Sequence, residues 1–462
     1  MSNIRLFIDF GSTFTKAVAF DLDKEELAAR AQAPSTVDSD VAIGLRQVLE
    51  LLGEMIPIGE REVSQAVASS SAAGGLHMLC IGMVPEYTTE AGRMAALGAG
   101  AKVTGTYSYE LSPLEIEEIR AAKPDIILLT GGTDGGNKSV ITHNAQILAQ
   151  SGVCAGHIIV AGNKSANIGI SAIFKDTGFR VHYTENVMPE LGKINFEPAR
   201  ECIRAIFLSH IIQAKGIARV DSVIKSVLMP TPAAVLEAAK LIALGVPGRM
   251  NGMGELLLVD VGGATTDVYS IAAGYPMQEG TIMTGLPEPF EKRTVDGDLG
   301  LYHNLDVLVE IARQEGIAPE GDVRLNDEIL SQLYAARSVP QALGQARHQL
   351  LLARLAVKIA VERHAGKLEI LVTGNGTTRR QRGKDLTGLR QVIGTGGPVS
   401  FSSDPRWVLE GASGRGKGEA ALKPAAPRFY IDASYILFAI GLLSQMEPQK
   451  ALNIIHKYLK PV

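Results

Sequence analysis

Short apolar runs alternate with polar turns and helix-like segments along most of the sequence. Near the start, the run IRLFI leads into Asp9 and a second run, AVAF, follows a polar turn, so this stretch predicts a β-hairpin. Residues 40–56 place apolar side chains at helical spacing and predict a helix. Further helices are predicted at 197–215, at 232–244 and at about 341–364.

Between about residues 76 and 186 the pattern becomes a strict alternation of strand and helix. Five strand-like runs, LHMLCIGM, AKVTGTYSY, DIILLTGG, HIIVAG and RVHYTE, are separated by helix-like segments. One of these segments has Ser112, Pro113 and Glu115 in the order that is typical of a helix start. The alternation predicts a doubly wound parallel sheet, in which ligands bind at the carboxyl ends of the strands.

The composition adds size and compartment to this picture. The chain has 462 residues, 46% of them hydrophobic, which predicts two or more domains. A net charge of −4 gives no sign of nucleic-acid binding. The three cysteines Cys80, Cys154 and Cys202 have no CxxC or metal-site spacing, so we expect free thiols and a cytoplasmic protein. The start has no signal-peptide pattern, and the apolar stretch Tyr435 to Leu443 is too short to cross a bilayer, so no membrane contact is expected.

Two distant segments share one pattern. The stretches IDFGSTFTKAVAF and VDVGGATTDVYSI each contain an apolar strand, an aspartate, one apolar residue, a glycine, small and hydroxyl residues, and a second apolar strand. The aspartates are Asp9 and Asp260. Because glycine has no Cβ, the backbone amides of such a turn can come close to phosphate oxygens. One hairpin alone could be a simple strand-ending turn, but a second copy and a further glycine turn, VIGTGG at 392–397, weigh against that reading.

The polar residues of these turns suit a magnesium nucleotide. Two carboxylates beside phosphates are tolerated when a cation lies between them, and Mg²⁺ takes one or two carboxylates together with phosphate oxygens. Lys16 can reach terminal phosphates as a point charge. Hydroxyl groups of the two turns can add donors; these are Ser12, Thr13, Thr265 and Thr266. The residues therefore predict a site for ATP and Mg²⁺.

These three glycine turns resemble the phosphate-1, phosphate-2 and adenosine motifs of the actin-like ATPase superfamily, which includes sugar kinases, DnaK-type chaperones and actin. The resemblance implies that Asp260 orients or activates the attacking water and that Asp9 and Asp267 hold Mg²⁺ through its waters, although any of the three carboxylates could be the base. Asp9, Asp260 and Asp267 are thus the predicted catalytic and metal residues. The predicted nucleotide contacts are Gly11, Ser12, Thr13, Thr15, Lys16, Gly262, Gly263, Thr265, Thr266, Gly394, Thr395, Gly396 and Gly397.

The same resemblance implies a fold and a division of the chain. The fold class is α/β, a two-lobed actin-like ATPase with ribonuclease H-like sheets and an inserted doubly wound parallel block. The stretch 431–443 resembles the connecting helix near the lobe hinge. The expected domains are a first lobe formed by 1–75 and 187–253, an inserted domain at 76–186, a second lobe at 254–427, and C-terminal helices at 428–462 that return to the first lobe.

A narrower likeness covers nearly the whole chain. The phrases LTGGTDGGNKSVITHNAQIL, VAGNKSA, TENVMPELGKINFEPAR and TPAAVLEAAKLI, with the two later glycine turns, resemble the glutamate mutase accessory family. That family is called MutL or GlmL and is unrelated to the mismatch-repair protein of the first name. The resemblance implies an ATPase that reactivates an adenosylcobalamin-dependent mutase, foremost glutamate (methylaspartate) mutase, by releasing damaged cobalamin. The mutase would be its protein partner, and the oligomeric state is left open.

Several alternatives remain at this stage. A small-molecule kinase, a polymerising actin-like protein and a nucleotide-gated binding module would all use the same nucleotide site. Residues 76–186 lack the DxHxxG pattern of a cobalt-ligating histidine, so this block either docks on the mutase or has a structural role. TGGTDGG at 130–136 is either an anion site or a strand end. DGDLG at 296–300 is either a metal loop or a solvated turn, and the basic run from Arg379 to Lys384 is either a nucleotide contact or a solvated loop.

Overall fold

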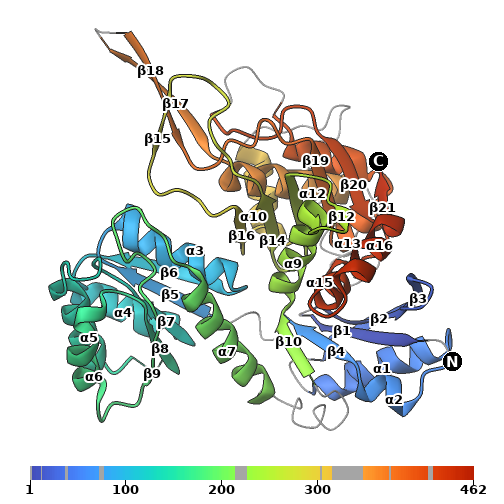
Figure 1. Ribbon diagram of the computed structural model, residues 1–462, viewed down its shortest axis with the longest axis horizontal. Coiled ribbons are helices and arrows are strands. Elements are labelled where there is room, and N and C mark those ends of the chain that lie inside the picture. The colour runs from blue at the N-terminus through green and yellow to red at the C-terminus, as the bar shows by residue number, and fades with distance from the viewer. Residues whose placement is uncertain are drawn as a thin grey trace.

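The computed structural model describes residues 3–11, 13–36, 40–71, 77–153, 155–213, 226–301, 304–314, 347–373, 376–414 and 420–462. These residues form two lobes, each built on its own sheet, and an α/β domain that lies to one side of them (Figure 1).

The first lobe contains a five-stranded sheet in the order β10-β4-β1-β2-β3. β1, β2 and β3 are antiparallel neighbours, while β4 and β10 run parallel to β1. The sequence folds this way because β1 and β2 are apolar on both faces and are buried along most of their length. The strands are β1 (Ile4–Phe10), β2 (Phe14–Asp21), β3 (Glu26–Pro34), β4 (Val67–Ser70) and β10 (Ser226–Pro230), and the helices are α1 (Val41–Gly53), α2 (Glu60–Ser64), α7 (Glu197–Gln213) and α9 (Thr231–Leu244).

The sheet of the second lobe repeats this arrangement. Its order is β16-β14-β13-β19-β20-β21, in which β13, β14 and β16 are antiparallel and β19 and β20 run parallel to β13. Without the added β21, the order β20-β19-β13-β14-β16 corresponds strand for strand to the order β10-β4-β1-β2-β3 of the first sheet. The strand directions correspond as well. The strands are β13 (Leu256–Val261), β14 (Thr266–Ile271), β16 (Glu291–Asp296), β19 (Gln391–Thr395), β20 (Arg428–Asp432) and β21 (Leu459–Pro461). Two related sheets in two lobes are the fold of the actin-like ATPases, as predicted.

Helices and a small projecting sheet complete the second lobe. The long helix α12 packs its apolar residues under the sheet, against Leu257 and Val259. The helices are α10 (Leu305–Gln314), α12 (Arg347–His364), α13 (Gly397–Ser400), α14 (Pro405–Leu409) and the 3₁₀ turn η4 (Glu410–Ala412). β15 (Thr281–Thr284), β17 (Lys367–Thr373) and β18 (Gly376–Arg382) form a three-stranded sheet that extends away from the lobe (Figure 1). Two short strands, β11 (Gly245–Val246) and β12 (Met250–Asn251), pair after α9.

The C-terminal segment differs from the single helix expected at 431–443. The strand β20 ends at Asp432, whose carboxylate accepts the backbone N–H groups of Ile436 and Leu437, and the helix therefore starts at Leu437, six residues later than expected. β20 and β21 join the second sheet. The helices α15 (Leu437–Ser444) and α16 (Pro448–Tyr458) share one apolar core with α9 and with strands of both lobes. This segment therefore connects the lobes, and it does not belong to the first lobe alone.

The inserted domain is a five-stranded parallel sheet in the order β6-β5-β7-β8-β9 (Figure 1). It leaves the first lobe after β4 and returns through α7 to β10. The predicted helix start at Ser112 is confirmed, since its hydroxyl and the Glu115 carboxylate form a capping box. The elements are β5 (His77–Gly82), the π-helical turn η1 (Pro85–Thr89), α3 (Glu90–Gly98), β6 (Lys102–Ser108), α4 (Pro113–Ala122), β7 (Ile126–Leu129), α5 (Ser139–Gln150), β8 (His157–Val160), the 3₁₀ turn η2 (Lys164–Ala166), α6 (Asn167–Phe174) and β9 (Arg180–Tyr183).

Within the part of the chain that the structure describes, no helix is both long enough and apolar enough to cross a membrane.

Candidate functional site

A cleft of about 580 Å³ lies where the two hairpins face each other between the lobes. This volume is within the usual range of small-molecule sites. Both hairpins contribute, and so do α13 and the turn before α15. Predicted site residues that line the cleft are Asp9, Gly11, Thr13, Lys16, Asp260, Gly262, Gly263, Thr265, Asp267 and Gly397.

The two hairpin turns have the same geometry. The Gly11 N–H donates to the Phe14 carbonyl at 3.0 Å, and the Gly262 N–H donates to the Thr265 carbonyl at 2.9 Å. A Cβ on either glycine would lie 2.5 Å or 2.9 Å from the same carbonyl oxygen, so neither turn has room for a side chain. The repeated sequence pattern therefore corresponds to a repeated structure.

Asp9 lies at the end of β1 and is almost fully buried. Its Oδ2 accepts from Lys16 Nζ at 3.0 Å, and its Oδ1 accepts from the hydroxyls of Ser69 and Thr231. These donors come from β2, β4 and α9. The carboxylate is thus fixed by three elements of the first lobe, with its charge balanced by one lysine.

Lys16 also reaches across to the second lobe. Its Nζ donates to the Tyr435 hydroxyl at 3.1 Å and lies 4.4 Å from the centre of that ring. Tyr435 is in the turn between β20 and α15 and has a positive φ of 53°. Burial opposes the charged form of Lys16, but Tyr435 and Asp9 outweigh it and raise the pKa of the amine above its usual value. The cation therefore stays charged and bridges the two lobes.

The surroundings of Asp260 disfavour its charged form, whereas those of Lys16 favour the charged amine. Among the described residues, no side chain donates a hydrogen bond to its carboxylate. Burial, with the nearby charge of Asp267 next in importance, raises its pKa to about 7. The adenosine turn closes on it from one side, because a Cβ on Gly396 would lie 2.8 Å from Asp260 Oδ1. Asp260 is thus an unpaired carboxyl group at the cleft that titrates near neutral pH.

Asp267 faces Asp260 across the second hairpin, and its two oxygens already have partners. Oδ1 accepts from Arg293 Nε at 2.9 Å and from Arg293 Nη2 at 2.6 Å, and Oδ2 accepts from the Thr265 hydroxyl at 2.9 Å. This pair is buried, with the Arg293 side chain 3% exposed. Asp267 is therefore held rigidly at the edge of the cleft.

The remaining predicted contacts do not line the cleft. Thr15 lies against α1, Thr266 donates to the Leu299 carbonyl at 2.8 Å, and Thr395 donates to Asp432 at 3.1 Å. Gly394 leaves room for Val399 and Leu409, so it serves packing. These positions support the walls of the site. Ser12 lies outside the described residues.

Sequence reasoning missed several residues of the site. Thr231 lies directly before the helix predicted at 232–244 and has no predicted role in the site, and Tyr435 was seen only as part of an apolar stretch. Arg30 lies over the rings of Phe401 and Tyr435, at 5.0 Å and 5.6 Å from their centres, on the same cleft. None of these residues belongs to a glycine turn, and only the fold brings them together.

The DGDLG segment supports the second hairpin. Asp296 and Asp298 both form ion pairs with Arg363, and the Leu301 N–H donates to the Gly262 carbonyl at 3.1 Å. Within the described residues, no group of three or more metal-ligating side chains occurs. This segment is therefore a structural turn at the base of the predicted phosphate loop.

The TGGTDGG turn is closed by its own hydrogen bonds. Asn163 Nδ2 donates to the carbonyls of Gly136 and Asn137, and Asn186 Nδ2 donates to the Gly132 carbonyl. Gly132 has a φ of +72°, and a Cβ there would lie 2.0 Å from the Asn137 oxygen. These contacts favour the strand-end interpretation.

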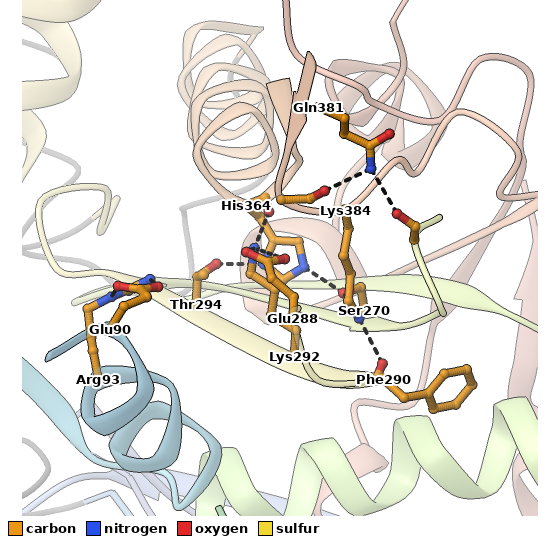
Figure 2. A network of polar contacts seen from close by, with 12 residues as sticks. Glu90, Arg93, Ser270, Glu288, Phe290, Lys292, Thr294, His364, Gln381 and Lys384 are labelled. Atoms are coloured by element: carbon orange, nitrogen blue, oxygen red, sulfur yellow. Dashed lines mark hydrogen bonds and ion pairs between the residues drawn. The ribbon is translucent and has the colours of Figure 1, made fainter. Parts of the chain in front are cut away.

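The basic run does not line the cleft either. Arg379, Arg380 and Arg382 lie on β18 in the projecting sheet, whereas Lys384 is buried in the second lobe. There its Nζ donates to the Phe290 carbonyl and to Ser270 Oγ, which also bonds His364 (Figure 2). Burial lowers the pKa of Lys384 to about 7.

This buried amine predicts a pH dependence of stability. Between about pH 7 and pH 10.5 the unfolded chain binds a proton at Lys384 that the folded chain does not, so the free energy of unfolding should rise with pH in this window. The slope is at most about 1.4 kcal/mol per pH unit. Lys384→Met should remove it, whereas Lys24→Met, at an exposed lysine, should keep it. Urea unfolding followed by the fluorescence of Trp407, the one tryptophan of the chain, reports on this lobe. Equal slopes in wild type and Lys384→Met would contradict the prediction.

Comparisons with known proteins identify relatives along almost the whole chain. A family model described as "MutL protein" matches residues 5–459. "Protein MutL" of Clostridium tetanomorphum is 44% identical over 460 residues, which are 99% of this chain and 99% of that protein.

Two solved structures resemble the chain along most of its length at low identity. The "Activator of the 2-Hydroxyisocaproyl-CoA Dehydratase from Clostridium difficile with bound ADPNP" is 10% identical, with 98% of this chain and 95% of that chain covered and a TM-score of 0.33. A xylulose kinase from Bifidobacterium adolescentis is 13% identical, with 98% and 93% covered and a TM-score of 0.29. The assignment of the fold rests on the strand order of the two sheets.

The full-length match to a close relative is decisive for the family. Because the family model covers almost every residue and the relative is 44% identical from end to end, the chain belongs to the MutL protein family.

Proposed function

We propose that this protein is an ATP-hydrolysing chaperone that reactivates an adenosylcobalamin-dependent mutase, with glutamate mutase as the first client to test. The observation that carries the ATPase part is the pair of equivalent glycine hairpins that face one cleft from two related lobes. Membership in the MutL protein family, together with the likeness to the glutamate mutase accessory family, supports the client.

In this proposal Asp260 is the group that orients or activates the attacking water. A general base works best when its pKa lies near the working pH, and the pKa of Asp260 is raised to about 7. A base also needs a carboxylate that is not already engaged, whereas Asp9 and Asp267 are both held by cations. The amides of both hairpins and the Lys16 amine would stabilise charge on the phosphoryl group.

The residues at the cleft suit a magnesium ion. Asp267, Asp9 and Asp432 each raise the pKa of Asp260, so negative charge is in excess there even with Lys16 nearby. A divalent cation would offset this excess, and carboxylates with phosphate oxygens are its usual ligands. Asp9 and Asp267 would hold the ion through its waters, which leaves the Asp260 carboxylate free to act on the attacking water. When bound, Mg²⁺ supplies positive charge that neutralises the phosphates.

The contact between Lys16 and Tyr435 suggests how nucleotide could change the lobes. Lys16 bonds both Asp9 of its own lobe and Tyr435 of the connecting segment. Nucleotide phosphates would compete with the Tyr435 hydroxyl for this amine, so bound and free states would differ in what joins the lobes. A client that binds the two states with different affinity would be driven between conformations as ATP is hydrolysed. Opening a mutase to release tightly bound, damaged cobalamin requires free energy, which ATP binding and hydrolysis would supply.

A small-molecule kinase is the main rival, because it would use the same cleft. It would consume ATP only with an acceptor present, whereas an actin-like assembly protein would sediment with ATP. A nucleotide-gated binding module would bind ATP and the mutase without releasing phosphate.

Recovery of mutase activity tests the proposal. Glutamate mutase is first inactivated with a cobalamin that lacks the adenosyl group, and this protein, fresh adenosylcobalamin and Mg-ATP are then added. Parallel reactions omit the nucleotide or contain the Asp260→Ala variant. We expect recovery only with ATP and the intact carboxylate. ATP hydrolysis without recovery in any reaction would confirm the nucleotide site and reject this client or this task.

A further inference from the structure

Arg293 joins the candidate nucleotide site to the inserted domain. It lies on β16, opposite Tyr269, and its buried side chain contacts both Asp267 of the second lobe and the end of α3. Two of its nitrogens, Nε and Nη2, donate to Asp267 Oδ1. The third, Nη1, donates to the backbone carbonyls of Leu97 and Ala101 at 3.0 Å and 3.1 Å. One guanidinium therefore binds two domains at once.

The contact on the inserted domain is the carboxyl end of a helix. α3 ends at Gly98, and the Leu97 carbonyl belongs to its last turn. Helix carbonyl ends carry partial negative charge, so a cation is favoured there. Asp267 and the end of α3 thus attract the same cation from opposite sides. A shift of either would change how strongly the guanidinium holds the other.

The surroundings leave room for such a shift. A crevice of about 660 Å³ separates the inserted domain from the second lobe beside this contact. Its walls include Leu97 and Val103 on one side and Lys292 and Thr294 on the other. Leu286 of the second lobe packs in the apolar cluster that also contains Ala95 of α3. The ion pair Arg382–Glu86, at 3.3 Å, is exposed, and exposed pairs are weak, so the buried guanidinium is the stronger polar connection of the two.

We infer that Arg293 is a positioning residue that couples the nucleotide state of the cleft to the inserted domain. The inference rests on the proposed function, because Asp267 and Thr265 sense nucleotide only if ATP binds between the hairpins. Nucleotide that changes the position of Asp267 alters the hold of Arg293 on the end of α3. By reciprocity, a client that moves the inserted domain alters Asp267 and hence nucleotide binding.

Amide hydrogen exchange at the end of α3 reports on this coupling. The N–H groups of Gly100 and Ala101 donate to the carbonyls of Leu97 and Ala96, so a peptide that covers residues 97–103 contains protected amides. The full chain is compared with and without Mg-ADPNP, a nucleotide that is not hydrolysed. We expect ADPNP to change the exchange of this peptide in the wild type.

Two arginine variants separate coupling from general stability. Arg293→Lys keeps the charge but loses the fork that binds both partners. It should still bind ADPNP, lose the nucleotide-dependent change at 97–103, and lower kcat for ATP about tenfold with a smaller effect on KM. Arg354→Lys is the matched control, since Arg354 also pairs with a carboxylate and donates to a backbone carbonyl but lines neither the cleft nor α3. It should behave like the wild type.

The outcomes also separate this inference from the ATP site itself. If ADPNP binds the wild type without changing exchange at 97–103, the coupling is wrong and the ATP site stands, and this result needs no variant to fold. A full nucleotide-dependent change in Arg293→Lys would equally overturn the role of Arg293. If ADPNP does not bind the wild type, the proposed ATP site fails and the coupling fails with it.

Discussion

Replacing Asp260 with asparagine is expected to lower ATP hydrolysis by about 10²- to 10⁴-fold, the usual contribution of a general base. The amide has nearly the same size as the carboxyl group, but it cannot accept a proton from water. Lys16 pairs with Asp9 and Arg293 pairs with Asp267, so no other carboxylate of the cleft is as free to take over. Binding of ATP should persist, because the hairpin amides and Lys16 remain.

Phosphate release and equilibrium binding of ATP together measure this effect. Asp23→Asn is the control for loss of one negative charge, since Asp23 is exposed in the first lobe. The control should hydrolyse ATP like the wild type. Hydrolysis by Asp260→Asn within a few-fold of wild type would move the base to another residue. Loss of ATP binding would instead show that Asp260 acts mainly in holding the magnesium nucleotide.

The same variant has a consequence for stability. The pKa of Asp260 is about 7 in the folded chain and near 3.8 when unfolded, so its contribution to stability is lost as pH rises from about 4 to about 7. Without nucleotide or divalent cation, Asp260→Asn should therefore raise the Tm at pH 8 by about 2 °C or more and change it little at pH 4. An Asp260→Asn variant that is more stable but inactive would indicate that the Asp260 carboxylate serves catalysis at a cost in stability.

Local pattern predicted the parts of this fold that repeat. The two hairpins share a sequence pattern because each turn needs a glycine that bonds the carbonyl three residues later. In the inserted domain the central strands β5, β7 and β8 are short apolar runs buried on both faces, whereas the edge strands β6 and β9 are partly exposed and were predicted from the alternation with helices. In both cases the residues that carry the sequence pattern are also the residues that form the turn or the strand.

Elements with weaker local signals were missed. β3 alternates small buried alanines, Ala29, Ala31 and Ala33, with partly exposed Arg30 and Gln32. Alanine favours helices and is depleted in strands, so this alternation does not look like a strand in the sequence. β20 was merged with the helix that follows it, because both are apolar and the boundary depends on the cap at Asp432.

Only part of the candidate site could be predicted from the sequence. Residues inside the glycine turns were found, but their partners come from elsewhere in the chain. Thr231 reaches Asp9 from α9, and Tyr435 reaches Lys16 from the segment before α15. Arg293 binds two backbone carbonyls, which carry no sequence signal at all. Such contacts follow from the packing of the two lobes and the inserted domain, and no spacing in the sequence encodes them.

Lys16→Met is expected to destabilise the protein and to weaken ATP binding, because Lys16 serves both Asp9 and the phosphates. Removing one partner of a buried ion pair leaves the other charge uncompensated and costs about 3 kcal/mol or more. For a chain of 462 residues that lowers the Tm by roughly 3 °C or more. Loss of the charged contact to phosphate should weaken ATP affinity by about 10- to 100-fold.

A double-mutant cycle separates these two roles. Asp9→Asn alone leaves Lys16 without its carboxylate, while the double variant Asp9→Asn with Lys16→Met contains neither charge. Because the pair is buried, with side chains 11% and 1% exposed, the double variant should lose less stability than the sum of the single variants. Additive losses in thermal unfolding would show that the two side chains do not stabilise each other.

Tyr435→Phe completes the comparison, since it removes only the hydroxyl that accepts from Lys16 at 3.1 Å. If nucleotide phosphates and Tyr435 compete for the amine, this variant should bind ATP at least as tightly as the wild type, in contrast to Lys16→Met. Isothermal titration with ATP and Mg²⁺ gives both affinities. Should Lys16→Met bind ATP like the wild type, Lys16 is a structural partner of Asp9, and the charge that holds the phosphates must come from the hairpin amides and the metal ion.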